Sequence, residues 1–237
     1  MTVLVDYDNI QAIEKQRGVL QAITHVVQTI ASVAKAIGPR VNVRLYGGWF
    51  EQMKMSRSAI TISPQVTKDF PQAMSLSVAG SIVTTIVNVE MAYSLIADPQ
   101  RPFTHTYRPR AAPLNIRSLP DPFADCASHA GCPIGAIHAF LRDQKCPTPG
   151  CTVSPERVLL KPEQKLVDVM IAVDLLYLSA NSKEPIALVS TDEDFWPAVQ
   201  FSLVGGCELI HLHPVAGRRT PQHYSRYATG NYVEASF

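Results

Sequence analysis

Short apolar segments alternate with segments of helical periodicity near the start of the chain. Residues Val3 to Val5 form an apolar run bounded by polar residues, which is typical of a buried parallel strand. Residues 18–38 carry apolar side chains at steps of three and four, which predicts a helix that ends before a Gly-Pro pair. Residues 41–50 alternate and predict a second strand, so the three elements form a βαβ unit.

The same alternation returns in the last third of the chain. Residues 161–181 predict a long apolar helix, residues 185–206 a buried strand, an acidic turn and a helix, and residues 207–214 a further strand. Between these regions, residues 81–96 are compatible with a strand that runs into a helix. We therefore predict one domain over residues 1–237, a three-layer α/β/α fold with a mostly parallel central sheet.

Composition and charge narrow the class of protein. The 237 residues are 46% hydrophobic and 17% charged, as expected of a soluble globular chain, and no apolar run is long enough for a membrane span. The first residues lack the basic region and cleavage site of a signal peptide, so we expect a cytoplasmic protein without membrane contact. A net charge of +1 gives no global basic field, although residues 107–110 and 217–219 form local basic patches.

Acidic and amide side chains follow the ends of two predicted strands and the start of the helix between them. They are Asp6, Asp8, Asn9, Asp168, Asp192, Glu193 and Asp194. In parallel sheets the carboxyl ends of the strands share one edge, so these side chains are expected to meet there. Neighbouring carboxylates repel unless a cation joins them, and hard oxygen ligands suit Mg²⁺ or Mn²⁺. Such ions activate water and stabilise the oxygens in phosphodiester cleavage.

Simpler roles exist for some of these aspartates. An aspartate at a strand end is often a turn residue or a helix N-cap, and this interpretation stays open for Asp8. Asp174 follows Asp168 by six residues, about 120° round a helix. Its side chain is therefore expected on another face, where helix packing or hydrogen bonding explains it as well as catalysis does.

Four segments in order resemble the motifs of a known family. They are "VLVDYDNI", "VRLYGGWF", "KLVDVMIAVDLL" and "LVSTDEDFWPAV", which lie within residues 2–50 and 160–213. Together they resemble the NYN domain family, a branch of the PIN-like nucleases. The resemblance implies a metal-dependent ribonuclease that cleaves RNA. Carried over by position, it implies that Asp6, Asp168 and Asp192 bind Mg²⁺ or Mn²⁺, with Asp194 as a further ligand or supporting acid.

The resemblance also gives roles to neutral side chains and contains one departure. Asn9 would orient a ligand or contact the substrate, and Ser190 would hydrogen-bond the acidic cluster. Thr191 stands where the family usually has glycine, which puts the tightness of that turn in doubt.

Cysteines are concentrated in a proline-rich segment at about residues 104–158. Two pairs, each of short spacing, are separated by thirteen residues: Cys126 with Cys132, and Cys146 with Cys151. This pattern predicts a structural Zn²⁺ site that stabilises an inserted segment, with His129 or His138 as substitutes for one thiolate. A disulfide or unrelated thiols are the alternatives. The segment is suited to gripping RNA, docking a protein partner or closing the active site, and the sequence does not distinguish these roles.

Two other functions compete with ribonuclease activity. The residues "DYDNI" also resemble the motif of haloacid-dehalogenase-type phosphatases, in which Asp6 would be the nucleophile. A PIN-like domain that has kept only RNA or protein binding is the second alternative, although the acids of the site are all present.

Overall fold

The computed structural model describes residues 1–111, 116–118, 132–228 and 230–237. The chain divides into two compact units, of which the first consists of Met1–Tyr107 and Gln164–Phe237, and the second of Arg108–Glu163. The second unit overlaps the segment 104–158 in which the sequence predicts the cysteine-rich insertion. Among the described helices, none is long and apolar enough to cross a membrane.

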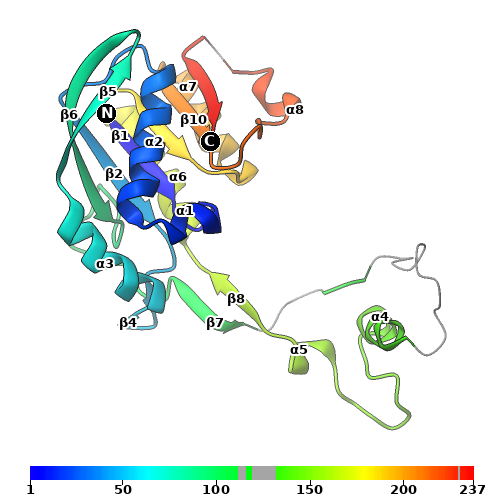
Figure 1. The fold of residues 1–237 in the computed structure, drawn as a ribbon. Coiled ribbons are helices and arrows are strands. Elements are labelled where there is room, and N and C mark those ends of the chain that lie inside the picture. The colour runs from blue at the N-terminus through cyan, green and yellow to red at the C-terminus, as the bar shows by residue number, and fades with distance from the viewer. Residues whose placement is uncertain (112–115, 119–131, 229) are drawn as a thin grey trace. The chain divides into compact units, whose positions relative to one another are not determined.

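The first unit contains a seven-stranded sheet with helices packed on it (Figure 1). Its elements in chain order are β1 (Thr2–Asp6), α1 (Ala12–Gln16), α2 (Val19–Val33), β2 (Arg40–Tyr46), β3 (Phe50–Glu51), β4 (Lys54–Met55), α3 (Arg57–Asp69), β5 (Gln72–Val78), β6 (Ser81–Met91), α6 (Val167–Asn181), β9 (Ile186–Val189), the 3₁₀ helix η1 (Glu193–Phe195), α7 (Trp196–Val204), β10 (Leu209–His213), α8 (Gln222–Ser225) and β11 (Tyr232–Ser236).

The strand order of this sheet is β11-β10-β9-β1-β2-β6-β5. All neighbours pair in parallel except β5 and β6, which form an antiparallel pair. The predicted α/β class with a mostly parallel sheet is therefore confirmed. Strand β1 is central, with β2 on one side and β9 on the other, so the residues that follow β1 and β9 leave the sheet next to each other.

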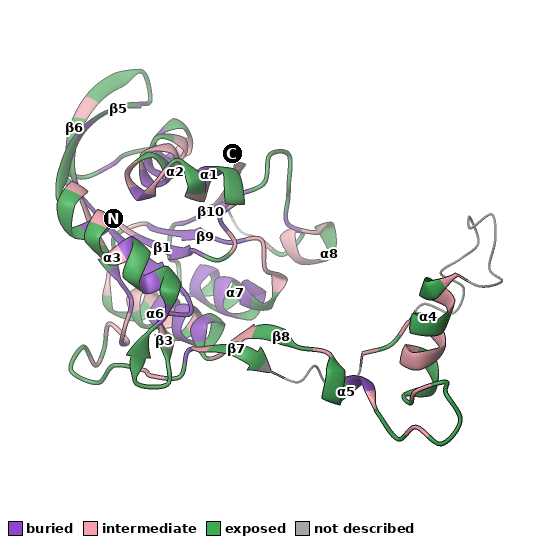
Figure 2. Cartoon of the chain, turned by 60° about the horizontal axis from the view of Figure 1, so that its bottom comes forward, coloured by how far each residue is buried: buried purple, intermediate pink, exposed green. Residues whose placement is uncertain are grey.

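Alternate residues of β1 belong to two different hydrophobic clusters. Val3 and Val5 pack in one cluster with apolar residues of α2, whereas Leu4 belongs to a second cluster with residues of α6 and α7. Successive side chains of a strand point to opposite faces, so apolar helices cover both faces of β1. Figure 2 shows β9 and β10 buried along their length and β1 buried after its first residue, Thr2, as expected of parallel strands covered on both sides.

Two predicted helices differ from the structure at their bounds. The helix expected over 161–181 begins only at Val167, because Lys161–Gln164 forms strand β8 and Leu166 adopts a left-handed conformation. The helix expected over 18–38 is α2, which ends at Val33 because Ala34 is extended. After α2 the apolar pattern continues with Ala34 and Ile37, past the point where the backbone leaves the helix.

The interpretation of residues 81–96 as a strand running into a helix was wrong in its second half. Residues Ser81–Met91 form one strand, and no helix follows it within the described residues 92–96. The β-branched side chains of this segment favour the strand, and Ala79 and Gly80 supply the two positive φ values of a tight turn from β5.

The second unit contains few regular elements. They are β7 (Tyr107–Ala111), α4 (Pro133–Asp143), α5 (Pro155–Val158) and β8, and β7 pairs with β8. Among its described residues, helix α4 buries none of its side chains. None of the described residues of this unit belongs to a hydrophobic core cluster, so a unit of this size calls for another source of stability.

Candidate functional site

Asp6 is the buried centre of the edge where β1 and β9 end. Its side chain is only 2% exposed. One carboxylate oxygen, Oδ1, accepts hydrogen bonds from the backbone N–H groups of Asp8 at 3.2 Å and of Asn9 at 3.4 Å. The other, Oδ2, accepts from the Asn9 side-chain amide and from the Ser190 hydroxyl at 3.4 Å. An aspartate that bonds the backbone two and three residues on forms a tight turn, which fixes Asp6 at the end of its strand.

Asn9 links the loop after β1 to the loop after β9. Its amide nitrogen donates to Asp6, and its amide oxygen accepts from the backbone N–H of Thr191 at 3.3 Å and from the Thr191 hydroxyl. A glycine at position 191, as the family pattern has, would keep the first bond of Thr191 and lose the second. The threonine therefore adds a connection between the two loops.

The loop after β9 is ordered by its own side chains. The Ser190 hydroxyl accepts from the backbone N–H of Asp192 at 3.0 Å, and Asp192 Oδ1 accepts from the backbone N–H of Asp194 at 2.9 Å. Asp192 is thus the N-cap of η1, one of the simpler roles expected for such an aspartate. The cap uses only one of its two carboxylate oxygens, Oδ1.

The carboxylates at this edge act on one another electrostatically. Burial raises the pKa of Asp6 from 3.8 to about 7, with further contributions from the charges of Asp8 and Asp168. The pKa of Asp168 is also raised, by desolvation first and then by Asp192, Asp194 and Asp8. Because Asp168 is exposed, water screens the charges around it and reduces the shift of its pKa. The acids expected to meet at the edge are therefore close enough to sense each other's charge.

The same side chains do not converge on a single point. Within the described residues, no three His, Cys, Asp or Glu side chains are gathered closely enough to hold one metal ion together. The donor chemistry fits a hard divalent cation, since every acid of the edge offers carboxylate oxygens. A cation would have to draw these carboxylates together, and the exposed surfaces of Asp168 and Asp194 leave them room to move.

Sequence reasoning missed the groups that surround Asp8. The Lys15 ammonium donates to the backbone oxygen of Asp8 at 3.0 Å and lies 5.2 Å from the centre of the Tyr7 ring. Asp8 Oδ2 accepts from the backbone N–H of Gly48 at 3.3 Å. A Cβ at Gly47 would stand 3.2 Å from the same oxygen and 2.9 Å from the Trp49 ring. The glycine pair after β2 was the only signal in the sequence for this close approach.

Asp174 has a structural role away from the acidic edge, one of the roles expected for it. Its side chain is fully buried. It accepts hydrogen bonds from the Tyr46 hydroxyl at 2.6 Å and from the backbone N–H of Ile96 at 2.8 Å, and Arg44 Nε lies 3.9 Å away. These donors connect α6 to β2 and to the chain after β6.

Two buried histidines on β10 form a second polar cluster, which the sequence analysis treated only as part of a strand. His211 and His213 lie with their ring centres 4.2 Å apart. Burial, followed by the neighbouring His213, lowers the pKa of His211 to about 4, so its imidazole is neutral near pH 7. A neutral His211 can donate from Nε2 to the Ser190 backbone oxygen, 3.2 Å away. This bond ties β10 to the loop that carries Asp192.

The cysteines of the second unit are free thiols among the described residues. Cys146 and Cys151 lie at the ends of one turn, and hydrogen bonds from Thr148, followed by one involving Cys151, lower the pKa of Cys146. Cys132 precedes α4, while Cys126 and His129 lie outside the described residues. The zinc site stays a prediction.

Comparison with known proteins identifies no relative of the chain: no protein-family model, curated protein or solved structure matches it. Any functional conclusion therefore rests on the residues and their arrangement.

Proposed function

We propose that the chain is a metal-dependent ribonuclease of the NYN type, with a three-layer PIN-like fold and a zinc-stabilised insertion. The observation that supports this proposal most is the placement of Asp6. A carboxylate that is 2% exposed lies at the end of the central strand, and Asp8 and Asp168 add negative charge to its surroundings. Concentrated negative charge is costly for the fold alone and useful where a cation binds.

Asp6, Asp168 and Asp192 would hold the ion, with Asp194 as a further ligand or supporting acid. A bound Mg²⁺ or Mn²⁺ supplies a water nucleophile at neutral pH and stabilises charge on the phosphate oxygens. The residues of the chain orient the carboxylates that bind it. Asn9 and Ser190 fix the Asp6 carboxylate through its Oδ2, and Thr191 holds Asn9 in place.

The experiment is cleavage of labelled single-stranded and structured RNAs in Mn²⁺, in EDTA, and with the variant Asp6→Asn. We expect cleavage that EDTA abolishes and that Asp6→Asn lowers by about two orders of magnitude or more, because one ligand and one negative charge are lost. Asp69→Asn, at the end of α3, is the matched control for loss of one aspartate charge outside the edge. Equal rates for wild type and Asp6→Asn would refute the proposal.

A non-catalytic RNA- or protein-binding module is the second candidate. The spread of the carboxylates, which do not converge within the described residues, is compatible with this function as well as with the first. This function predicts RNA binding without cleavage in any divalent cation, and binding that survives Asp6→Asn.

A further inference from the structure

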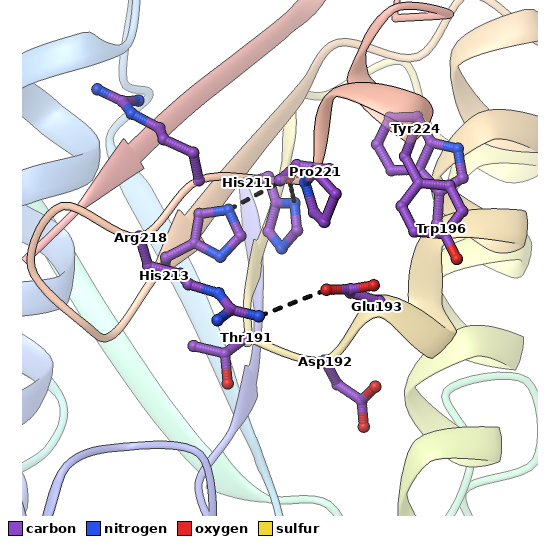
Figure 3. Close-up of a pocket in the computed structure, with 11 residues that line it drawn as sticks. Thr191, Asp192, Glu193, Trp196, His211, His213, Arg218, Pro221 and Tyr224 are labelled. Atoms are coloured by element: carbon purple, nitrogen blue, oxygen red, sulfur yellow. Dashed lines mark hydrogen bonds and ion pairs between the residues drawn. The ribbon is translucent and has the colours of Figure 1, made fainter.

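A small pocket lies at the carboxyl ends of β9 and β10, beside the acidic edge (Figure 3). The loop after β9 lines it with Thr191, Asp192 and Glu193, and β10 and the chain after it complete the wall. Figure 3 shows the two histidines side by side, with Trp196 and Tyr224 at the other side of the pocket. The cavity measures about 10 Å³, the room of a single water-sized group.

Two buried polar atoms of this pocket have no hydrogen-bond partner in the part of the chain that the structure describes. They are Nδ1 of His213 and Nε1 of Trp196. The other ring nitrogen of His213, Nε2, lies 2.7 Å from a carboxylate oxygen of Glu234, so Nε2 carries a proton and Nδ1 is the open position. A buried polar atom left without a partner destabilises the fold, and such atoms call for a ligand or an ordered water.

Arg218 closes the pocket with an ion pair that is easily exchanged. Its guanidinium lies 3.4 Å from a carboxylate oxygen of Glu193, and both side chains are almost half exposed. An ion pair of this kind stabilises the fold only weakly, because water screens it. Arginine also matches the oxygens of a phosphate with two parallel N–H groups. A phosphate can therefore displace Glu193 at little cost.

We propose that this pocket binds a backbone phosphate of an RNA strand, which Arg218 holds at the mouth of the cavity. The inference rests on the proposed function, because it places the RNA along the same edge. The acidic residues follow β1 and β9, and the pocket follows β9 and β10, so a strand lying over the carboxyl ends of the sheet crosses both.

The test compares Arg218→Ala with Glu193→Gln. Both variants break the same ion pair, but only the first removes the phosphate ligand. Binding of a short labelled single-stranded RNA is measured in EDTA at several salt concentrations, so that no cleavage contributes. We expect Arg218→Ala to weaken binding about tenfold or more and to reduce the slope of log K against log salt by roughly 0.7. Glu193→Gln should tighten binding, because it releases Arg218.

Equal weakening by both variants would show that the ion pair only shapes the loop, and would overturn the proposal. An unchanged salt slope in Arg218→Ala would do the same. Arg101→Ala removes an exposed arginine outside the pocket and should leave the slope unchanged. Arg218→Lys keeps the charge without the paired N–H groups, and should recover part of the binding.

Cleavage in Mn²⁺, measured in parallel, separates this inference from the proposed function. RNA that is cut by the wild type and bound independently of Arg218 leaves the ribonuclease proposal standing and refutes the pocket. RNA that is bound through Arg218 but never cut supports the pocket and refutes the ribonuclease proposal. A strong preference for RNA with a 5′-phosphate over RNA with a 5′-hydroxyl would place a terminal phosphate in the pocket and overturn the assignment to the backbone.

Discussion

The pH dependence of stability offers the most direct test of the buried Asp6. Its pKa is about 7 in the folded protein and 3.8 as the ordinary value, so between these values the folded state binds a proton that the unfolded state has lost. Stability must then fall as pH rises through this window, and the loss is complete above pH 7. The full shift corresponds to an upper bound on the order of 4 kcal/mol. From about pH 5 to pH 8 we expect a loss of roughly 2–3 kcal/mol without a divalent cation.

The assay is urea unfolding in EDTA at several pH values, for the wild type and for Asp6→Asn. The asparagine does not titrate, so the variant should show a flatter dependence of unfolding free energy on pH. It also lacks one carboxylate oxygen that accepts from Asn9 and Ser190, which costs about 1–3 kcal/mol at every pH. The quantity to compare is therefore the slope of unfolding free energy against pH in the wild type and in Asp6→Asn. Asp69→Asn should keep the slope of the wild type.

Addition of Mn²⁺ completes this prediction. A cation that binds only the folded protein stabilises it by about 2.7 kcal/mol at a hundred times its dissociation constant. This stabilisation should appear in the wild type at pH 8 and be largely absent from Asp6→Asn. The reasoning is refuted if wild type and variant respond alike to pH and to Mn²⁺, because Asp6 would then neither hold a proton near neutrality nor bind a cation.

Three further predictions concern separate parts of the chain. Asp174→Ala should lower the unfolding free energy by about 2–4 kcal/mol in urea unfolding, because it leaves the Tyr46 hydroxyl and the backbone N–H of Ile96 without their acceptor; a loss below about 0.5 kcal/mol would contradict this. Thr191→Val should reduce RNA cleavage while lowering stability by about 1 kcal/mol, since only the hydroxyl bond to Asn9 is lost; unchanged cleavage would exclude a role for that bond. Purified protein should contain one Zn²⁺ per chain by elemental analysis and lose it in Cys146→Ser, and a metal-free wild type would refute the zinc site.

The sequence predicted the features that depend on local pattern. The apolar run of β1, the steps of α2 and the buried strand β9 identified the mostly parallel sheet, and the rule for carboxyl ends placed Asp6 and Asp192 at one edge. The start of α6 was misplaced because the apolar periodicity does not record that Leu166 leaves the helical conformation. Local patterns therefore predict that a helix or strand exists more reliably than they predict the residue at which it begins or ends.

The groups missed by sequence reasoning are those that depend on contacts between distant segments. His211 and Ser190 lie 21 positions apart in the chain and meet because β10 pairs with β9 in parallel register. In the sequence, "HLH" is an ordinary alternation of polar and apolar residues. This contact has no signature within a window of local sequence.

Two buried aspartates of the first unit lie in different electrostatic surroundings. Burial raises the pKa of both. Around Asp174 the opposing groups are donors: Tyr46, the backbone of Ile96 and the Arg44 cation, so the fold itself accounts for the charge. Around Asp6 the next contributions are the negative charges of Asp8 and Asp168, which raise its pKa further. Repulsion between neighbouring carboxylates does not stabilise the packing around Asp6. A cation bound at this edge would attract all of these carboxylates and turn the electrostatic contribution from unfavourable to favourable. On the proposed function, the same acids that oppose folding in the absence of an ion would therefore favour it once one is bound.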